Sequence, residues 1–197
     1  MQEHKENILI ERIKETVRTN RHATGEVILH RQIASPLVTA EDIAQAEAQI
    51  GFELPPFLSR LYLEIGDGGF GPGYGLLPLN NHNTSIDSLV TAYLGMKSMS
   101  QKDIDEYWAN EEEKPSLWPE RVLMVCDWGC NIYSSVNCAS PDLVMYRLDS
   151  NINFMVEWAI EASSLQDWLE AWVDGKPLAD LDWEQAAKVS VSDLGNA

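Results

Sequence analysis

The apolar residues of this chain change their spacing after residue 115, and this change constrains the fold more than any other feature. Apolar residues recur at helical spacing before that point, and four short β-type runs then follow, at residues 121–126, 132–138, 143–148 and 153–158. Turn-forming residues separate these runs, at positions 127–129, 140–142 and 149–151. Consecutive strands with short connections pair antiparallel. The sequence therefore predicts an α+β fold, with an antiparallel meander flanked by helices.

Local signals place the helices around this meander. Thr39 and Asp42 occupy the N-cap and N3 positions of a capping box, and Gly51 stands where that helix should end. Pro55 and Pro56 suit the first turn of a second helix, which Gly66 stops. Apolar residues at helical spacing predict further helices at residues 3–19, 86–94, 104–108 and 165–172.

The charge distribution divides the chain into parts. Residues 1–35 carry six basic and five acidic groups, a net +1, whereas residues 36–197 carry eight basic and 26 acidic groups, a net −18. We expect a single domain at residues 38–175, preceded by a helical arm at 1–37 and followed by an acidic tail at 176–197. The tail has room for a short helix around Trp183. The sequence leaves open whether the arm packs on the domain or pairs with a second copy.

The overall charge restricts the partners that this chain can bind. Its 14 Lys and Arg against 31 Asp and Glu give a formal charge of −17. This surface disfavours nucleic acid and anionic membrane, and a charged partner should be basic. The N-terminus lacks the apolar stretch of a signal peptide, and three cysteines cannot all pair with one another, so we expect a cytoplasmic protein with reduced thiols.

No residue pattern in the sequence predicts a catalytic, metal or cofactor site. Gly66, Gly68 and Gly71 fit the dinucleotide fingerprint G-x-G-x-x-G, but a helical stretch precedes them and Pro72 follows, so a structural turn is favoured. Cys126, Cys130 and Cys138 lack the spacing of a zinc site and are expected to be structural.

Three further features leave alternatives open. His82 follows the glycine-rich loop and is the best-placed candidate base, although a solvated loop residue is favoured. Trp128, expected in a turn, could anchor a protein interface or lie half-buried at the sheet edge. The acidic stretches at 101–113 and 157–184 could form a solvated face or a docking surface for a basic partner.

Two motifs resemble the SUKH superfamily, which includes the fungal Smi/Knr cell-wall synthesis regulators and many bacterial relatives. The first is T-x-E-D-I-x-x-A-E-x-x-I-G-F-E-L-P-P-F-L-x-x-L-Y, from Thr39 to Tyr62, and the second is V-L-M-V-C-D-W-G-C-N-I-Y, from Val122 to Tyr133. The resemblance covers residues 38–175. This chain departs from the family at Phe57, where Tyr is usual, and at Cys130-Asn131, which replaces the usual Gly-Asp.

The resemblance implies a protein without catalytic residues. Many bacterial members look like immunity proteins that neutralise polymorphic toxins, often nucleases, and the fungal relatives act as regulators and interaction hubs. We therefore expect a protein that neutralises a basic toxin domain by stoichiometric binding, with a Smi/Knr-type regulatory module as the alternative. The expected partner-binding residues are Asp67, Tyr74, Glu111, Glu112, Glu113, Asp127 and Trp128.

Overall fold

The computed structural model describes residues 2–30, 32, 35–80, 88–110, 112, 114–152, 155–178 and 181–194. The helices are α1 (Gln2–Thr19), α2 (Ala40–Ile50), α3 (Pro56–Glu64), α4 (Leu89–Lys97), α5 (Gln101–Tyr107), α6 (Leu165–Val173) and α7 (Val191–Leu194). The strands are β1 (Val122–Gly129), β2 (Ile132–Asn137), β3 (Met145–Asp149), β4 (Glu157–Ala162) and β5 (Lys188–Ser190). None of the described helices is long and apolar enough to cross a membrane.

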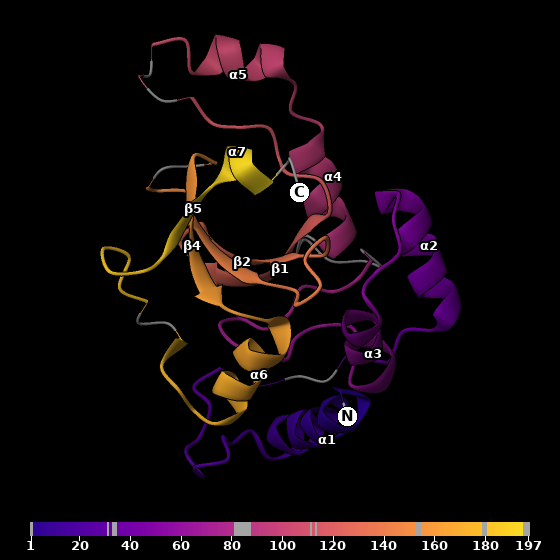
Figure 1. Cartoon of the computed structure of the whole chain (residues 1–197). Coiled ribbons are helices and arrows are strands. Elements are labelled where there is room, and N and C mark those ends of the chain that lie inside the picture. The colour runs from indigo at the N-terminus through magenta and orange to yellow at the C-terminus, as the bar shows by residue number, and fades with distance from the viewer. Residues whose placement is uncertain are drawn as a thin grey trace.

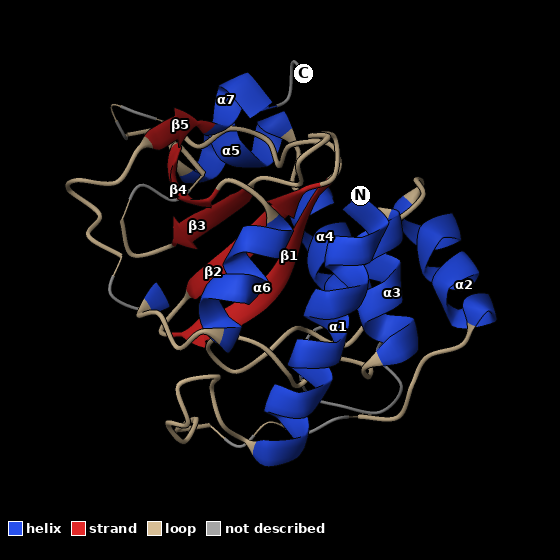
Figure 2. Cartoon of the chain, turned by 60° about the horizontal axis from the view of Figure 1, so that its bottom comes forward, coloured by secondary structure: helices blue, strands red, loops and turns tan. Residues whose placement is uncertain are grey.

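The strands form one antiparallel sheet in the order β1-β2-β3-β4-β5. This confirms the predicted α+β fold and its meander. In Figure 1, α6 and α1 lie below the sheet and α5 and α7 lie above it, and the second view shows α6 crossing one face of the sheet (Figure 2). The three-residue strand β5, which the sequence pattern did not predict, completes the sheet beside β4.

The predicted helix caps are present. The Thr39 side chain accepts a hydrogen bond from the Asp42 backbone N–H, the Asp42 carboxylate accepts from the Thr39 N–H, and Gly51 ends α2 with a left-handed φ of 86°. Two further capping boxes, which the sequence patterns did not predict, join Ser88 with Thr91 at the start of α4 and Ser100 with Asp103 at the start of α5. All three boxes satisfy backbone N–H groups that have no partner inside the helix.

The first hairpin differs from the prediction. The turn expected at residues 127–129 belongs to β1, which extends to Gly129, and Trp128 therefore lies in a strand. The turn is formed by Cys130 and Asn131, whose φ angles of 53° and 63° are both left-handed. Two consecutive positive φ angles match the twist of a two-residue hairpin, so the chain reverses two residues later than the sequence suggested.

Two further strand boundaries are shifted. The run predicted as a strand at 153–158 is β4 at Glu157–Ala162, and β3 begins at Met145 instead of residue 143. Leu143 and Met155 have φ angles of 56° and 54°, which interrupt an extended backbone. Met155 is nevertheless fully buried. Apolar residues that fill the core from a left-handed turn look like strand residues in the sequence.

The segment Leu76–Leu79, which looked strand-like, makes only an isolated bridge between Leu76 and Cys126. Side chains form hydrogen bonds with other backbone groups of this segment. The Tyr62 hydroxyl donates to the Leu77 carbonyl (2.8 Å), and the Asp67 carboxylate accepts from the Leu79 N–H (2.6 Å). Residues 183–185 form a turn where a tail helix was expected, and the short tail helix is α7 instead.

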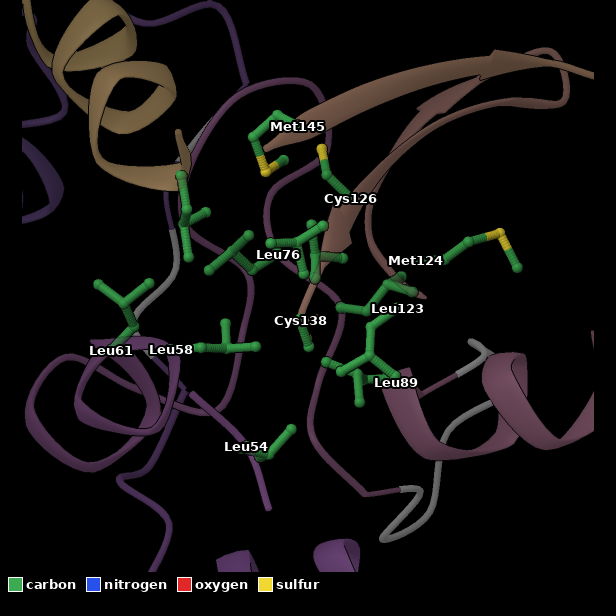
Figure 3. Close-up of a cluster of buried hydrophobic side chains, with 14 of the residues drawn as sticks. Leu54, Leu58, Leu61, Leu76, Leu89, Leu123, Met124, Cys126, Cys138 and Met145 are labelled. Carbon is green, nitrogen blue, oxygen red and sulfur yellow. The ribbon is translucent and has the colours of Figure 1, made fainter. Parts of the chain in front are cut away.

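A single buried cluster joins the sheet to the helices. In Figure 3, Leu58 and Leu61 extend from α3 and Leu89 from α4 toward the same interior, whereas Met124 points away from Leu123, its neighbour in β1. The N-terminal arm belongs to this cluster, because Leu9, Ile10 and Ile13 of α1 are at most 2% exposed. Helix α1 contacts α6 and α3, so its apolar stripe packs on the rest of the same chain.

Ile13→Ala should lower the free energy of unfolding by about 2–5 kcal/mol, because it removes a fully buried side chain and leaves a cavity. Ile8→Ala in the same helix is the matched control, since Ile8 is 49% exposed and should cost well under half as much. Urea unfolding of both variants measures the difference. Equal losses of stability would contradict the packing of α1 on the domain.

Candidate functional site

The glycine-rich loop, residues 66–75, lies along the outer edge of β1. The Tyr74 N–H donates to the Asp127 carbonyl (2.9 Å), and the Leu77 N–H donates to the Val125 carbonyl (2.8 Å). At Gly73, with φ of 58°, a Cβ atom would lie 2.7 Å from the Asp127 carbonyl oxygen. Glycine is therefore required for this close approach. The loop follows helix α3, not a strand, and so lacks the strand-loop-helix geometry of a dinucleotide site.

The loop brings three of the predicted residues together. Tyr74 is 59% exposed, and its ring contacts the His30 ring in a tilted arrangement with centroids 4.9 Å apart. The Asp127 carboxylate accepts from the Gly129 N–H (2.6 Å), and a Cβ at Gly129 would lie 2.8 Å from the Tyr74 ring. Trp128 is half-buried against the core. Tyr74, Asp127 and Trp128 thus lie close together at the end of the first hairpin.

A groove of about 490 Å³ opens beside this surface, and we call it the arm groove. Trp128 and Trp172 form part of its lining, with Ile28 of the arm. At its rim, Val27 is 57% exposed and Leu29 is 98% exposed. The full lining comprises His22, Glu26, Val27, Ile28, Leu29, His30, Gly71, Pro72, Gly73, Trp128, Trp172, Gly175, Lys176, Pro177 and Leu178. A mostly apolar groove with a few polar groups is typical of a binding site.

A buried polar network holds Trp128 in place. Its indole Nε1–H donates to Ser134 Oγ (2.7 Å), and the Ser134 hydroxyl donates to Glu161 Oε2 (2.5 Å). Glu161 also pairs with Arg147, whose guanidinium carbon lies 4.1 Å from the centre of the Trp128 ring. Arg147 further donates to the Leu178 carbonyl (3.0 Å). The network crosses β1 to β4 and reaches the segment that borders the groove.

Asp67 and Glu112, the other predicted residues that the structure describes, are not part of this surface. Asp67 is tied to the backbone at Leu79 and serves the fold of the loop. Glu112 is exposed in the connection between α5 and β1. Glu111, Glu113 and His82 lie outside the described residues.

Much of the acidic charge has a structural role. Among the described residues, seven carboxylates accept hydrogen bonds from backbone N–H groups: Asp42, Glu47, Asp67, Asp103, Asp127, Asp149 and Asp182. Such bonds favour the ionised carboxylate, and they contribute to the lowered pKa of Asp103, whose largest cause is the hydrogen bond from the Ser100 hydroxyl. These carboxylates keep their negative charge, but their oxygens are already bonded within the chain and are less available to contact a partner directly.

The cysteines show little nucleophilic character. Burial raises the pKa of Cys126 well above its ordinary value and that of Cys138 to about 12, which keeps both thiols protonated. Cys130 is exposed in the hairpin turn. Among the residues with a described position, no three His, Cys, Asp or Glu side chains are arranged to hold a metal ion.

A second groove, of about 790 Å³, lies at the N-terminal end of α6, whereas the arm groove lies at its C-terminal end, and the second groove is more polar. Glu53, Asp142 and Asp167 lie in its wall with Arg121, whose guanidinium carbon is 5.4 Å from the centre of the Phe52 ring. We call it the polar groove.

Sequence reasoning missed the arm residues and the buried pair, although both left a signal. Val27-Ile28-Leu29 is an apolar run in the segment that follows the predicted arm helix, and Leu29 is almost fully exposed. Arg147 and Glu161 interrupt apolar strand runs, which indicates a charge that needs a buried partner. Their pairing across β3 and β4 depends on the strand register, and the predicted position of β4 was wrong.

Comparison with known protein families gives one match. Residues 37–171 match the model of the SMI1 / KNR4 family (SUKH-1). No curated protein matches the chain.

Glu161→Gln should lower the free energy of unfolding by about 3–5 kcal/mol, because it leaves the Arg147 charge buried without its counter-ion. The two side chains are only 6% and 1% exposed. Glu106→Gln is the control, since Glu106 and its partner Lys102 are 64% and 81% exposed and should contribute about 0.5 kcal/mol or less. Chemical denaturation of both variants measures the two losses of unfolding free energy. Equal losses would show that the buried pair is dispensable for stability.

Proposed function

The chain belongs to the SMI1 / KNR4 family (SUKH-1), and on this basis we propose that it is a non-catalytic immunity protein that neutralises a polymorphic toxin by stoichiometric binding. Membership of this family suggests either an immunity protein or a Smi/Knr-type interaction module. We propose a basic, nuclease-type toxin domain as the target, whose active face the bound protein would cover.

The exposed aromatic surface beside the glycine-rich loop carries this proposal. Tyr74 is 59% exposed, yet the His30 ring and the backbone of Gly129 restrict its position. Trp128 is fixed by its hydrogen bond to Ser134. Aromatic side chains held in one position lose little entropy on binding, and such residues often supply most of the binding energy at interfaces. Tyr74 and Trp128 are therefore the proposed anchors.

The charge of the protein would act at longer range. A net charge of −17 attracts a basic domain and raises the rate of encounter. Exposed Glu112 and its neighbours Glu111 and Glu113 form the densest run of acids in the sequence. We propose that this run steers the partner and that Asp67 acts only through the fold of the loop.

The alternative is a Smi/Knr-type regulatory module with a partner unrelated to toxins. The polar groove favours it, because most of its described lining residues lie within the family match. A groove built by the shared domain suits a partner common to many members.

Affinity capture from the native cell lysate, at low and high salt, separates the two proposals. Recovery of a basic toxin domain in stoichiometric amount, weakened by salt, is the expected result for an immunity protein. Reproducible recovery of other proteins alone would favour the regulatory module.

Tyr74→Ala should weaken binding to the captured toxin domain by about 2 kcal/mol or more, a loss of roughly 30-fold in affinity that appears mainly as faster dissociation. Tyr107→Ala is the matched control, since Tyr107 is 79% exposed on α5 and should not contact the partner. Surface plasmon resonance measures both. An unchanged dissociation rate for Tyr74→Ala would exclude it as an anchor.

Reversal of Glu111, Glu112 and Glu113 to Lys should slow association by about tenfold at low salt and flatten its salt dependence. The control reverses Glu41, Glu184 and Asp193, which are exposed on other elements and change the net charge equally. Stopped-flow mixing at several salt concentrations measures the rates. If both triple variants associate equally slowly, net charge alone steers the partner and residues 111–113 have no special role.

A further inference from the structure

The arm groove is built mainly by segments outside the family domain. Eleven of its fifteen described lining residues lie outside residues 37–171, in the arm at 22–30 and in the segment 172–178. The family domain contributes Gly71, Pro72, Gly73 and Trp128. The polar groove has the opposite composition, with only Gln2 and Glu6 outside the match. The arm groove is therefore the feature that this chain adds to the shared fold.

Hydrogen bonds fix the arm wall of this groove. The Ala23 N–H donates to the Val173 carbonyl (2.7 Å), and His22 Nδ1 lies 2.7 Å from the Trp172 carbonyl oxygen. Arg12 pairs with Asp174 at 2.5 Å. A Cβ at Gly175 would lie 3.2 Å from the His22 Cβ, so the two segments are in close contact. A wall held in this way need not be ordered by the ligand, which favours binding.

The opposite wall is equally restrained. Trp128 packs against Gly73, where a Cβ would lie 3.1 Å from the indole ring. Arg147 stacks on the same indole and bonds the carbonyl of Leu178, which also lines the groove. The buried network thus connects Trp128 to the glycine-rich loop at Gly73 and to the segment after α6 at Leu178.

The charges around the groove suit an apolar group carried by a basic protein. Its lining includes one acid and one lysine, Glu26 and Lys176, whose charges offset each other. The arm as a whole has a net charge of +1 and the remainder −18. An apolar side chain can therefore enter without stripping water from several carboxylates, while the body attracts the basic surface around it.

We propose that the arm groove receives an apolar side chain from a basic segment of the partner protein, and that residues 22–30 determine which partner is bound. This rests on the proposed function, since it assigns the recognition site of the same interaction. Leu29 and Val27 extend the apolar lining at the rim, and Tyr74 continues it across the His30 ring. The family domain supplies the platform, and the arm supplies the specificity.

A phage-displayed library of random peptides, selected on the full-length protein, tests this without knowledge of the natural partner. The expected peptides carry a large apolar residue flanked by Lys or Arg. A synthetic peptide of the selected sequence should bind about tenfold or more weakly to Leu29→Asp. The matched control is Leu37→Asp, because Leu37 is also exposed, at 58%, but does not line the groove. Because the Leu29 and Leu37 side chains are 98% and 58% exposed, both variants should retain the unfolding midpoint of the wild-type protein.

The inference fails if the selection enriches no peptide, or if the selected peptide binds Leu29→Asp and Leu37→Asp equally. It also fails if the wild-type protein is a dimer in sedimentation that Leu29→Asp dissociates, which would assign the groove to a second copy. If the captured toxin binds Leu29→Asp normally, the immunity function stands and the groove assignment fails. If the peptide binds the groove but no toxin is captured, the groove assignment stands and the toxin as partner fails.

Discussion

The buried ion pair between Arg147 and Glu161 is the interaction on which the arrangement of the candidate site depends. Two charges removed from water need each other and further hydrogen bonds to offset the loss of hydration. Here Ser134 donates to Glu161 and accepts from the indole of Trp128. Arg147 donates to the Leu178 carbonyl, while its buried Nε has no hydrogen-bond partner among the described residues. The pair therefore fixes the position of a groove residue and of the segment after α6. It links the register of four strands to the shape of the surface beside the glycine-rich loop.

The sequence predicted elements wherever local signals agree with the final structure. The capping box at Thr39 and Asp42, and the apolar stripe of α6, depend on neighbours within one helix. Strand boundaries failed where apolar residues adopt left-handed turns, as at Met155, because burial and extended conformation are separate properties. The position of Trp128 was wrong because a Cys-Asn pair, without glycine, forms the hairpin turn.

The candidate site was predicted only in part, for a related reason. The glycine-rich loop, which carries Tyr74, meets the end of β1, which carries Asp127 and Trp128. Both segments had turn signals in the sequence. The arm residues that complete the groove are distant in the sequence, and their contacts with the end of α6 could be derived only from the tertiary packing of α1. The composition also gave an incomplete prediction of the acidic binding residues. It counts the carboxylates that bond backbone N–H groups in caps and turns together with those whose oxygens can contact a partner.

We propose that this protein works through a fixed surface on a shared scaffold. The arm, the glycine-rich loop and the first hairpin form the proposed surface, and the acidic body is proposed to attract a basic partner. Amide hydrogen exchange on the complex with its captured partner tests this account most directly. The account predicts slower exchange on binding at residues 22–30, 71–75 and 127–129. Slower exchange confined to the polar groove, with these three segments unchanged, would contradict it.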